Sequence, residues 1–291
     1  MFNRKRGSNI KPSYAEKLEA VANAGFDVAE IHFCDSVRPE WQDQLASDSW
    51  ESAIDAAAEV AAAHSLPVVQ AKAPYLPTAF VRGQRPTEEQ MAAHCEMLRR
   101  SVLASAKLGV KNLILQPLND TVNCEYDTAV ELATNREFYA PVVELCLKNN
   151  IGVVFENTCK SHDMGLRRAY GENPEDLMAL VDSYGDPRVG ICWNFGHANF
   201  MIADQPRALR KIGDRLHATH LEDNRGFVDS HLIPFVGGNV KWERIVPCLR
   251  EIGFDGDMIF DAPSYTRDFP EELKCEAVKF AVTAGRYLLA L

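Results

Sequence analysis

The 291-residue sequence lacks the features that mark membrane-spanning and disulfide-rich proteins. Its longest apolar runs, such as residues 151–155, fall far short of the roughly 20 residues that a bilayer-crossing helix needs. Its eight cysteines lie far apart with no Cys-x-x-Cys pair, so we expect reduced thiols. The opening residues, MFNRKRGSNIKP, carry bases without a following apolar segment, so we expect no secretory signal and a cytoplasmic location.

Basic residues are also scarce. The sequence has 31 Lys+Arg against 41 Asp+Glu, a net charge of −10, and its one dense basic stretch is residues 4–6. A negative field of this kind repels polyanions, so we expect no nucleic-acid partner, and the short apolar runs argue against a membrane partner. A composition of 46% hydrophobic and 25% charged residues excludes collagen-like, low-complexity and disordered classes.

What the sequence does contain is a repeated alternation of apolar segments rich in Val and Ile with helical patterns, which is typical of βα units and a parallel sheet. Strands are predicted at residues 28–33, 67–71, 111–116, 151–156, 188–193, 216–221 and 257–261. Helices are predicted at 13–24, 48–64, 87–108, 135–149, 174–183, 205–213, 241–252 and 269–290. The length suits one barrel of about 250 residues with decorated loops. We therefore predict an α/β fold, a single (β/α)8 TIM barrel over residues 1–291, whose weak or irregular first strand comes from residues 1–6.

Polar side chains follow the predicted strands where each strand ends. In such a barrel the carboxyl ends of the strands converge on one face, which carries the chemistry. Glu156, Asn194, His220 and Asp261 together supply three oxygen-bearing side chains and one imidazole. Such a set suits Mn²⁺, Co²⁺, Mg²⁺ or Zn²⁺. The alternative is that each of these groups merely satisfies a backbone group or binds water.

Several segments together resemble the xylose-isomerase-like TIM-barrel superfamily, and the resemblance runs from about residue 13 to the end. The segments are residues 73–75, 154–157, 190–198, 217–226, 229–234, 237–242 and 253–256. This superfamily includes sugar-phosphate isomerases and epimerases, ketose 3-epimerases, hydroxypyruvate isomerase, inosose dehydratase and type IV apurinic endonucleases. The resemblance implies a divalent metal ion held by Glu156, Asn194, His220 and Asp261. It also implies that Glu156 and Asp261 transfer the proton through an enediolate.

The sequence departs from the superfamily pattern at two of these four positions. The related isomerases have aspartate where Asn194 stands and glutamate where Asp261 stands, so this site has one formal charge fewer. The nuclease members build a three-zinc cluster with histidines where this chain has Lys72 and Gln116, which argues against a nuclease. Three residues that match the ligands of the nucleases' third zinc are present, and they define a candidate second metal site: His197, Asp229 and His231.

The resemblance also implies a site for a polyhydroxylated substrate. The residues expected to bind a small carbohydrate are Lys72, Trp193, His197, Arg225 and His231. Arg225 offers rigid donors to an oxyanion, and Trp193 offers an apolar wall for a sugar ring. Lys72 has several interpretations: a base, an anchor for a substrate carboxylate, or a cation that compensates the acidic rim through a salt bridge.

Three functions from different classes are compatible with this pattern. The first is a divalent-metal-dependent sugar isomerase or epimerase acting on a ketose, a hydroxy-keto acid or a related polyol. The second is a lyase or dehydratase of the same superfamily, which eliminates a β-substituent from a keto-polyol or a 3-oxo-glycoside. The third is a non-catalytic sugar-binding barrel with a degraded metal site. Related barrels commonly dimerise or tetramerise, so a homo-oligomer is also expected.

Overall fold

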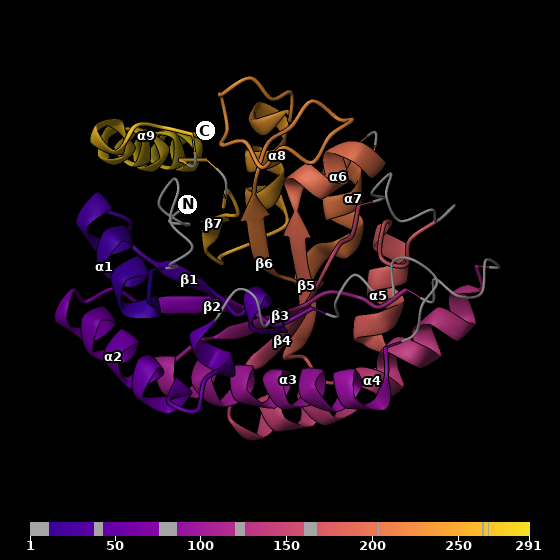
Figure 1. The fold of residues 1–291 in the computed structure, drawn as a ribbon. Helices are drawn as coiled ribbons and strands as arrows, with labels where there is room; N and C mark the ends of the chain where they lie inside the picture. The colour runs from indigo at the N-terminus through magenta and orange to yellow at the C-terminus, as the bar shows by residue number, and fades with distance from the viewer. Residues whose placement is uncertain are drawn as a thin grey trace.

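The computed structural model describes residues 12–37, 43–75, 86–119, 126–159, 168–202, 204–263, 265–266 and 268–291. Within these ranges seven parallel strands form one sheet in the order β1 to β7, and helices surround it (Figure 1). Each strand pairs with the next one in the sequence, with a helical crossover on the outside, as parallel βαβ units require. The result is a nearly closed barrel, which confirms the predicted α/β fold.

The seven strands overlap those predicted from the sequence. They are β1 (Ala29–His32), β2 (Val68–Lys72), β3 (Asn112–Leu115), β4 (Gly152–Glu156), β5 (Val189–Asn194), β6 (Leu216–Leu221) and β7 (Met258–Phe260). In the described part of the chain, β1 and β7 are the two edges of the sheet. The strand expected at residues 1–6 lies outside the described residues.

Nine α-helices cover the described part of the barrel. They are α1 (Tyr14–Ala24), α2 (Trp50–Ala63), α3 (Glu88–Leu108), α4 (Thr128–Lys148), α5 (Pro174–Asp182), α6 (Phe195–Met201), α7 (Gln205–Ile212), α8 (Trp242–Glu251) and α9 (Glu271–Ala290). Short 3-10 turns lie at Cys34–Val37, Gln44–Ala46 and Gly213–Arg215. Among the described helices, none has the length and apolar character needed to cross a membrane.

Two helices differ from the sequence prediction. Helix α4 begins at Thr128, seven residues before the predicted start, where Asp127 accepts hydrogen bonds from the backbone N–H groups of Ala129 and Val130. Its first turns bury Glu131 and Asn135, so they show no apolar stripe. Helix α6 is not predicted at all. It begins directly after β5 because the Asn194 side chain accepts a hydrogen bond from the backbone N–H of His197, a typical N-cap.

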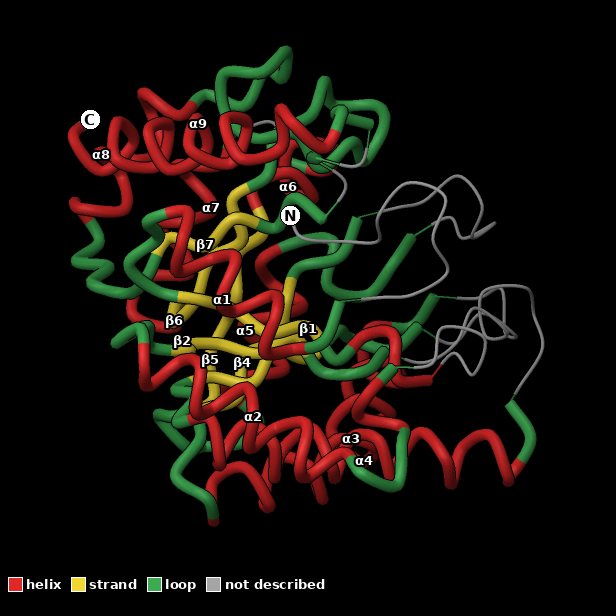
Figure 2. The backbone as a smooth tube through the Cα atoms, turned by 60° about the vertical axis from the view of Figure 1, so that its left-hand side comes forward, coloured by secondary structure: helices red, strands yellow, loops and turns green. Residues whose placement is uncertain are grey.

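The strands place an apolar layer and a polar layer inside the barrel, one above the other. Ile114, Val154, Cys192 and Ala218 form a small buried apolar cluster. Because side chains alternate between the two faces of a strand, Glu156, Asn194 and His220 lie two residues further along and point the same way. Asn194 pairs with His220, whereas Glu156 pairs with Cys192, two residues before the end of β5, so the carboxyl ends of β4 and β5 are staggered. The polar layer thus lies at one end of the barrel, whose strands Figure 2 shows in yellow between helices above and below.

Candidate active site

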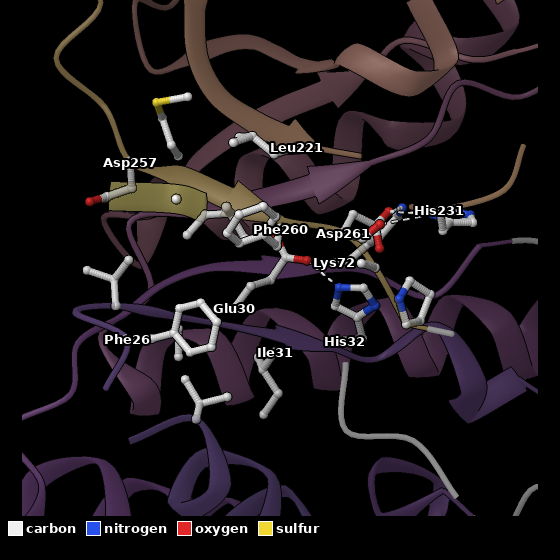
Figure 3. A pocket seen from close by; sticks show the side chains of 18 of the residues that line it. Phe26, Glu30, Ile31, His32, Lys72, Leu221, His231, Asp257, Phe260 and Asp261 are labelled. Carbon is white, nitrogen blue, oxygen red and sulfur yellow. Dashed lines mark hydrogen bonds and ion pairs between the residues drawn. The ribbon is translucent and has the colours of Figure 1, made fainter. Parts of the chain in front are cut away.

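The predicted strand-end residues meet in one place. A cavity of about 880 Å³ runs along β1 and β7 and beside α1 and α9, and it reaches the carboxyl ends of the strands; Figure 3 shows part of its lining. Its polar lining includes Glu30, His32, Lys72, Gln116, His197, Asp229, His231 and Asp261, and elsewhere along the cavity Lys17, Asp27, Asp257 and Arg286. Glu156 and His220 are fully buried and lie behind this lining. The cavity therefore offers a substrate many hydrogen-bonding groups above a layer of buried charge.

The Glu156 carboxylate lies at the centre of this buried layer. Its Oε1 accepts hydrogen bonds from Asn194 Nδ2 at 3.1 Å and from His220 Nδ1 at 2.5 Å. Its Oε2 accepts from Gln116 Nε2 at 3.0 Å and lies 3.0 Å from Lys72 Nζ. Burial opposes charge on this carboxyl, but Lys72 and His220 outweigh it and hold the pKa of Glu156 well below its ordinary value. Glu156 is therefore an ionised carboxylate bonded to four N–H donors.

Lys72 joins two carboxylates from distant parts of the chain. Its Nζ lies 3.2 Å from Asp261 Oδ2 as well as 3.0 Å from Glu156, and its side chain is only 9% exposed. Burial lowers the pKa of Lys72, but Asp261 and Glu156 outweigh that effect and raise it well above its ordinary value. The same ammonium holds the pKa of Asp261 below its ordinary value. Of the three interpretations of Lys72, the geometry supports the salt-bridged cation.

His220 bridges Glu156 to a carboxylate that the sequence analysis missed. Its Nε2 lies 2.8 Å from Glu30 Oε2, while its Nδ1 faces Glu156. Glu30 also contacts His32 (Figure 3) and Gln70. Burial raises the pKa of Glu30, but the two histidines outweigh it and lower the pKa to about 2. The sequence did contain a signal for Glu30: it is a charged residue within the apolar strand at 28–33, two positions before His32 and on the same face.

Three of the four predicted metal ligands lie together. Single donor atoms from Glu156, His220 and Asp261 all lie within 4.8 Å of one another, and we call these residues the first group. Asn194 completes the predicted set in sequence, but its Oδ1 accepts from the His197 backbone N–H at 3.0 Å and its Nδ2 faces Glu156. A backbone N–H can only donate, so this orientation of the amide is determined. The Asn194 oxygen is therefore already occupied by a backbone donor, so the predicted set of four metal ligands lacks one free ligand atom. The four-ligand metal site stays a prediction.

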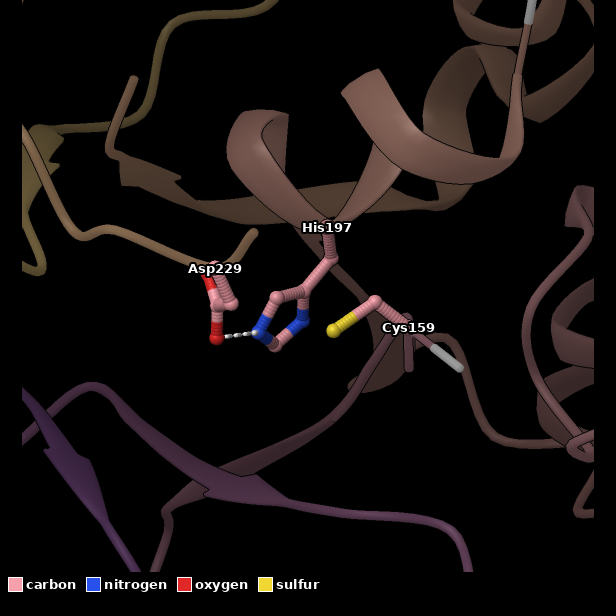
Figure 4. A group of neighbouring side chains, drawn as sticks. All are labelled: Cys159, His197 and Asp229. Carbon is pink, nitrogen blue, oxygen red and sulfur yellow. Dashed lines mark ion pairs between the residues drawn. The ribbon is translucent and has the colours of Figure 1, made fainter. Parts of the chain in front are cut away.

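The predicted second metal site is divided between two groups that share Asp229. Cys159, His197 and Asp229 form one group, and Glu222, Asp229 and His231 form the other, which we call the second group. Figure 4 shows the His197 imidazole between the Asp229 carboxylate and the Cys159 sulfur. His231 Nε2 lies 3.2 Å from Asp229 Oδ2, close to the roughly 3.3 Å that separates neighbouring ligands around a tetrahedral Zn²⁺.

The second group includes Glu222, a buried carboxylate that the sequence analysis did not select. It is fully buried and forms an ion pair with His231 Nδ1, while no hydrogen bond within the described residues reaches its Oε1. Gly196 makes room for it, because a Cβ at that position would lie 2.5 Å from the Glu222 side chain. A buried carboxylate oxygen without a donor is the kind of atom that a cation satisfies. The residues of the second group therefore fit a divalent ion.

Two predicted substrate-binding residues lie outside the cavity lining. Trp193 is fully buried on the outer face of β5, where its Nε1 donates a hydrogen bond to Gln205 Oε1 at 3.2 Å. It points away from the barrel interior because its neighbour Asn194 points inward. Arg225 is exposed, and its Nε donates to the Gly237 carbonyl at 3.0 Å. The other three, Lys72, His197 and His231, line the cavity.

Solved structures share this fold over nearly the whole chain. A structure described as a D-tagatose 3-epimerase-like protein is 21% identical, with a TM-score of 0.72, covering 96% of this chain and 95% of that one. A D-psicose 3-epimerase studied with D-fructose is 16% identical, with the same TM-score and the same coverage. An IOLI protein with a bound zinc atom is 17% identical, with a TM-score of 0.72, covering 96% and 94%. At these identities the likeness establishes the fold.

Sequence comparison identifies the family. Protein y4fM of Sinorhizobium fredii is 26% identical over 181 residues, which cover 60% of this chain and 54% of that protein. The chain thus spans about half the length of the curated relatives that it matches. Residues 18–280 match the family described as the xylose isomerase-like TIM barrel, most of the chain. The chain therefore belongs to the xylose isomerase-like TIM-barrel family.

Proposed function

We propose that this protein is a sugar isomerase or epimerase that moves a proton next to a carbonyl group of a ketose, a hydroxy-keto acid or a related polyol. The observation that carries the proposal is the pair of buried carboxylates, Asp261 in the lining of a cavity rich in hydrogen-bonding groups and Glu156 directly behind that lining. The solved structures of similar fold include epimerases of D-tagatose and D-psicose type, and one holds D-allulose.

The proposed mechanism uses the carboxylates as proton carriers. Asp261 lines the cavity and takes the proton from the carbon beside the carbonyl, so that the C–H electron pair moves toward the carbonyl oxygen. Return of the proton to the same carbon from the opposite face produces an epimer, and return to the neighbouring carbon produces an isomer. Glu156 is the proposed partner carboxylate, and Lys72, His197 and His231 bind substrate oxygens from the cavity wall.

A divalent metal ion is part of the proposal, and the second group is where the residues fit one. Glu222, Asp229 and His231 would hold it, with His197 nearby, since His197 Nε2 lies 3.7 Å from both carboxylates. An ion there would polarise a substrate oxygen and stabilise developing negative charge. The His197 Nδ1 contacts the Asn157 carbonyl at 2.7 Å, an orientation that turns Nε2 toward the carboxylates.

The experiment is isomer formation in D₂O. Purified protein is incubated with D-tagatose, D-fructose and D-allulose, with and without added Mn²⁺, and the products are identified by NMR. We expect a new epimer or isomer with deuterium at the reacting carbon. Glu156→Gln and Asp261→Asn should each lower the rate by at least about 100-fold, whereas the exposed Glu137→Gln serves as a matched control that leaves it unchanged.

Product mass separates the proposal from the lyase alternative. Isomerisation and epimerisation conserve the mass of the substrate, whereas elimination releases water or an aglycone. Absence of both deuterium incorporation and product with every ketose and polyol tested would refute the enzyme proposal. It would favour the non-catalytic sugar-binding protein.

A further inference from the structure

The first group differs from a vacant cation site because protein donors already surround its central carboxylate. Four donors surround the two Glu156 oxygens: Asn194 and His220 contact Oε1, Gln116 contacts Oε2, and Lys72 contacts both. A carboxylate oxygen has about two lone-pair directions for such contacts. An ion that bound Glu156 would therefore have to displace at least one of these donors.

Lys72 is the donor that stands where such an ion would lie. Its Nζ contacts the same two carboxylates, Glu156 and Asp261, that the predicted metal ligand set contains. The ammonium has three N–H donors, and within the described residues it contacts three carboxylate oxygens, Glu156 Oε1 at 3.3 Å, Glu156 Oε2 at 3.0 Å and Asp261 Oδ2 at 3.2 Å. Lys72 also lines the cavity, so its charge faces a bound substrate. The geometry thus supplies the site with a positive charge directed at the substrate.

Electrostatic repulsion prevents the Lys72 ammonium and a divalent metal ion from occupying the first group together. A divalent ion bonded to the Glu156 and Asp261 oxygens would lie within roughly 4 Å of the Lys72 ammonium, and repulsion at that distance weakens ion binding by about 1000-fold or more at an effective dielectric constant of about 20. The neighbouring carboxylates already have nitrogen partners. Glu30, Glu156 and Asp261 face Lys72 and the two histidines, His32 and His220.

We propose that the Lys72 ammonium, held by Glu156 and Asp261, is the resident cation of the first group and acts there in place of a divalent metal ion. This inference rests on the proposed function for its catalytic part. When Asp261 removes the proton, the C–H bond breaks, the electron pair forms the carbon–carbon double bond, and the carbonyl oxygen becomes an oxyanion. The positive charge of Lys72, which lines the cavity, stabilises that oxyanion, and Glu156 positions the ammonium.

The first test measures metal binding, independently of activity. Asp229→Asn removes the carboxylate shared by the other two candidate groups, so that of the three groups among the described residues only the first keeps all its ligands. Metal-stripped Asp229→Asn protein is titrated with Mn²⁺ and followed by calorimetry and electron paramagnetic resonance. We expect no binding with a dissociation constant below about 1 mM. Stoichiometric binding at micromolar Mn²⁺ that is lost in Asp229→Asn/Glu156→Gln would overturn the proposal.

The second test removes the ammonium. Asp229→Asn/Lys72→Met leaves Glu156 and Asp261 without their cation, so it should bind one Mn²⁺ at least about 100-fold more tightly than Asp229→Asn does. Its melting temperature should rise on adding Mn²⁺, whereas that of Asp229→Asn should not. A folded double variant that binds no Mn²⁺ would contradict the proposal. If the double variant does not fold, the titration of Asp229→Asn, which retains Lys72, still decides.

The catalytic role of Lys72 is tested separately, by measuring the activity of single Lys72 variants that retain Asp229. Lys72→Met should lose at least about 100-fold in turnover, and Lys72→Arg should retain part of it because the charge is preserved. Equal activity of Lys72→Met and the unmodified protein without metal would refute the catalytic role. A protein that converts no sugar refutes the proposed function, but the Mn²⁺ titrations still decide which cation the first group holds.

Discussion

Replacing Asn194 by aspartate tests the orientation of the Asn194 amide. That orientation decides whether the amide presents a donor or an oxygen to Glu156. Asn194 Nδ2 donates to Glu156 Oε1 at 3.1 Å, while Asn194 Oδ1 caps helix α6. Asn194→Asp retains the cap and places a carboxylate oxygen where the amide nitrogen stands. Two negative charges at this separation repel by about 5 kcal/mol at an effective dielectric constant of about 20.

Lys72 offsets part of this repulsion, because it already contacts Glu156 and Asp261. We therefore expect Asn194→Asp to lower the free energy of unfolding by about 2–4 kcal/mol at neutral pH. The pKa of the new carboxyl is raised above its value in the unfolded chain, so the lost stability returns as the pH falls and the group is protonated. Added Mn²⁺ should stabilise the variant more than it stabilises the unmodified protein.

The assay is urea denaturation followed by circular dichroism at neutral and mildly acidic pH, with and without Mn²⁺. The control is Gln90→Glu, which adds the same charge on the surface and retains the capping box at the start of α3. If Asn194→Asp and the unmodified protein unfold at the same urea concentration at neutral pH, the amide nitrogen does not face Glu156. The assignment of donors around Glu156 would then be wrong.

Two further predictions concern stability. His94 is buried against Phe138, and within the described residues neither ring nitrogen has a hydrogen bond. Burial lowers the pKa of His94 to about 4. Because the unfolded chain binds this proton at higher pH, stability should fall by on the order of 3 kcal/mol between about pH 6.5 and 4, and urea denaturation of His94→Phe should show a smaller fall. Asp223 accepts hydrogen bonds from the backbone N–H groups of Asn224 and Val240 and from Trp242 Nε1. Asp223→Asn places an amide N–H opposite one of these donors and should lower the free energy of unfolding by about 2–4 kcal/mol. An unchanged midpoint of urea denaturation would refute this prediction.

Much of the architecture was predictable because local chemistry specifies it. The alternation of apolar strands with helical patterns identified all seven described strands, and parallel strands bring their carboxyl ends to one face. That is why Glu156, His220 and Asp261 could be selected before their geometry was known. The start of α4 was missed because its first turns bury Glu131 and Asn135 in place of an apolar stripe.

The roles of the site residues depend on contacts between segments that are distant in the sequence. Lys72 lies 84 residues from Glu156 and 189 from Asp261, and no local pattern shows that its ammonium stands between them. Similarly, the direction of the Asn194 amide follows from the N-cap of a helix that was not predicted, and Glu222 approaches closely only because Gly196 has no side chain. Strand periodicity specifies which face a side chain occupies, because it is a property of the local backbone. Which donor or cation meets a carboxylate on that face depends on how the closed barrel brings separate strands together.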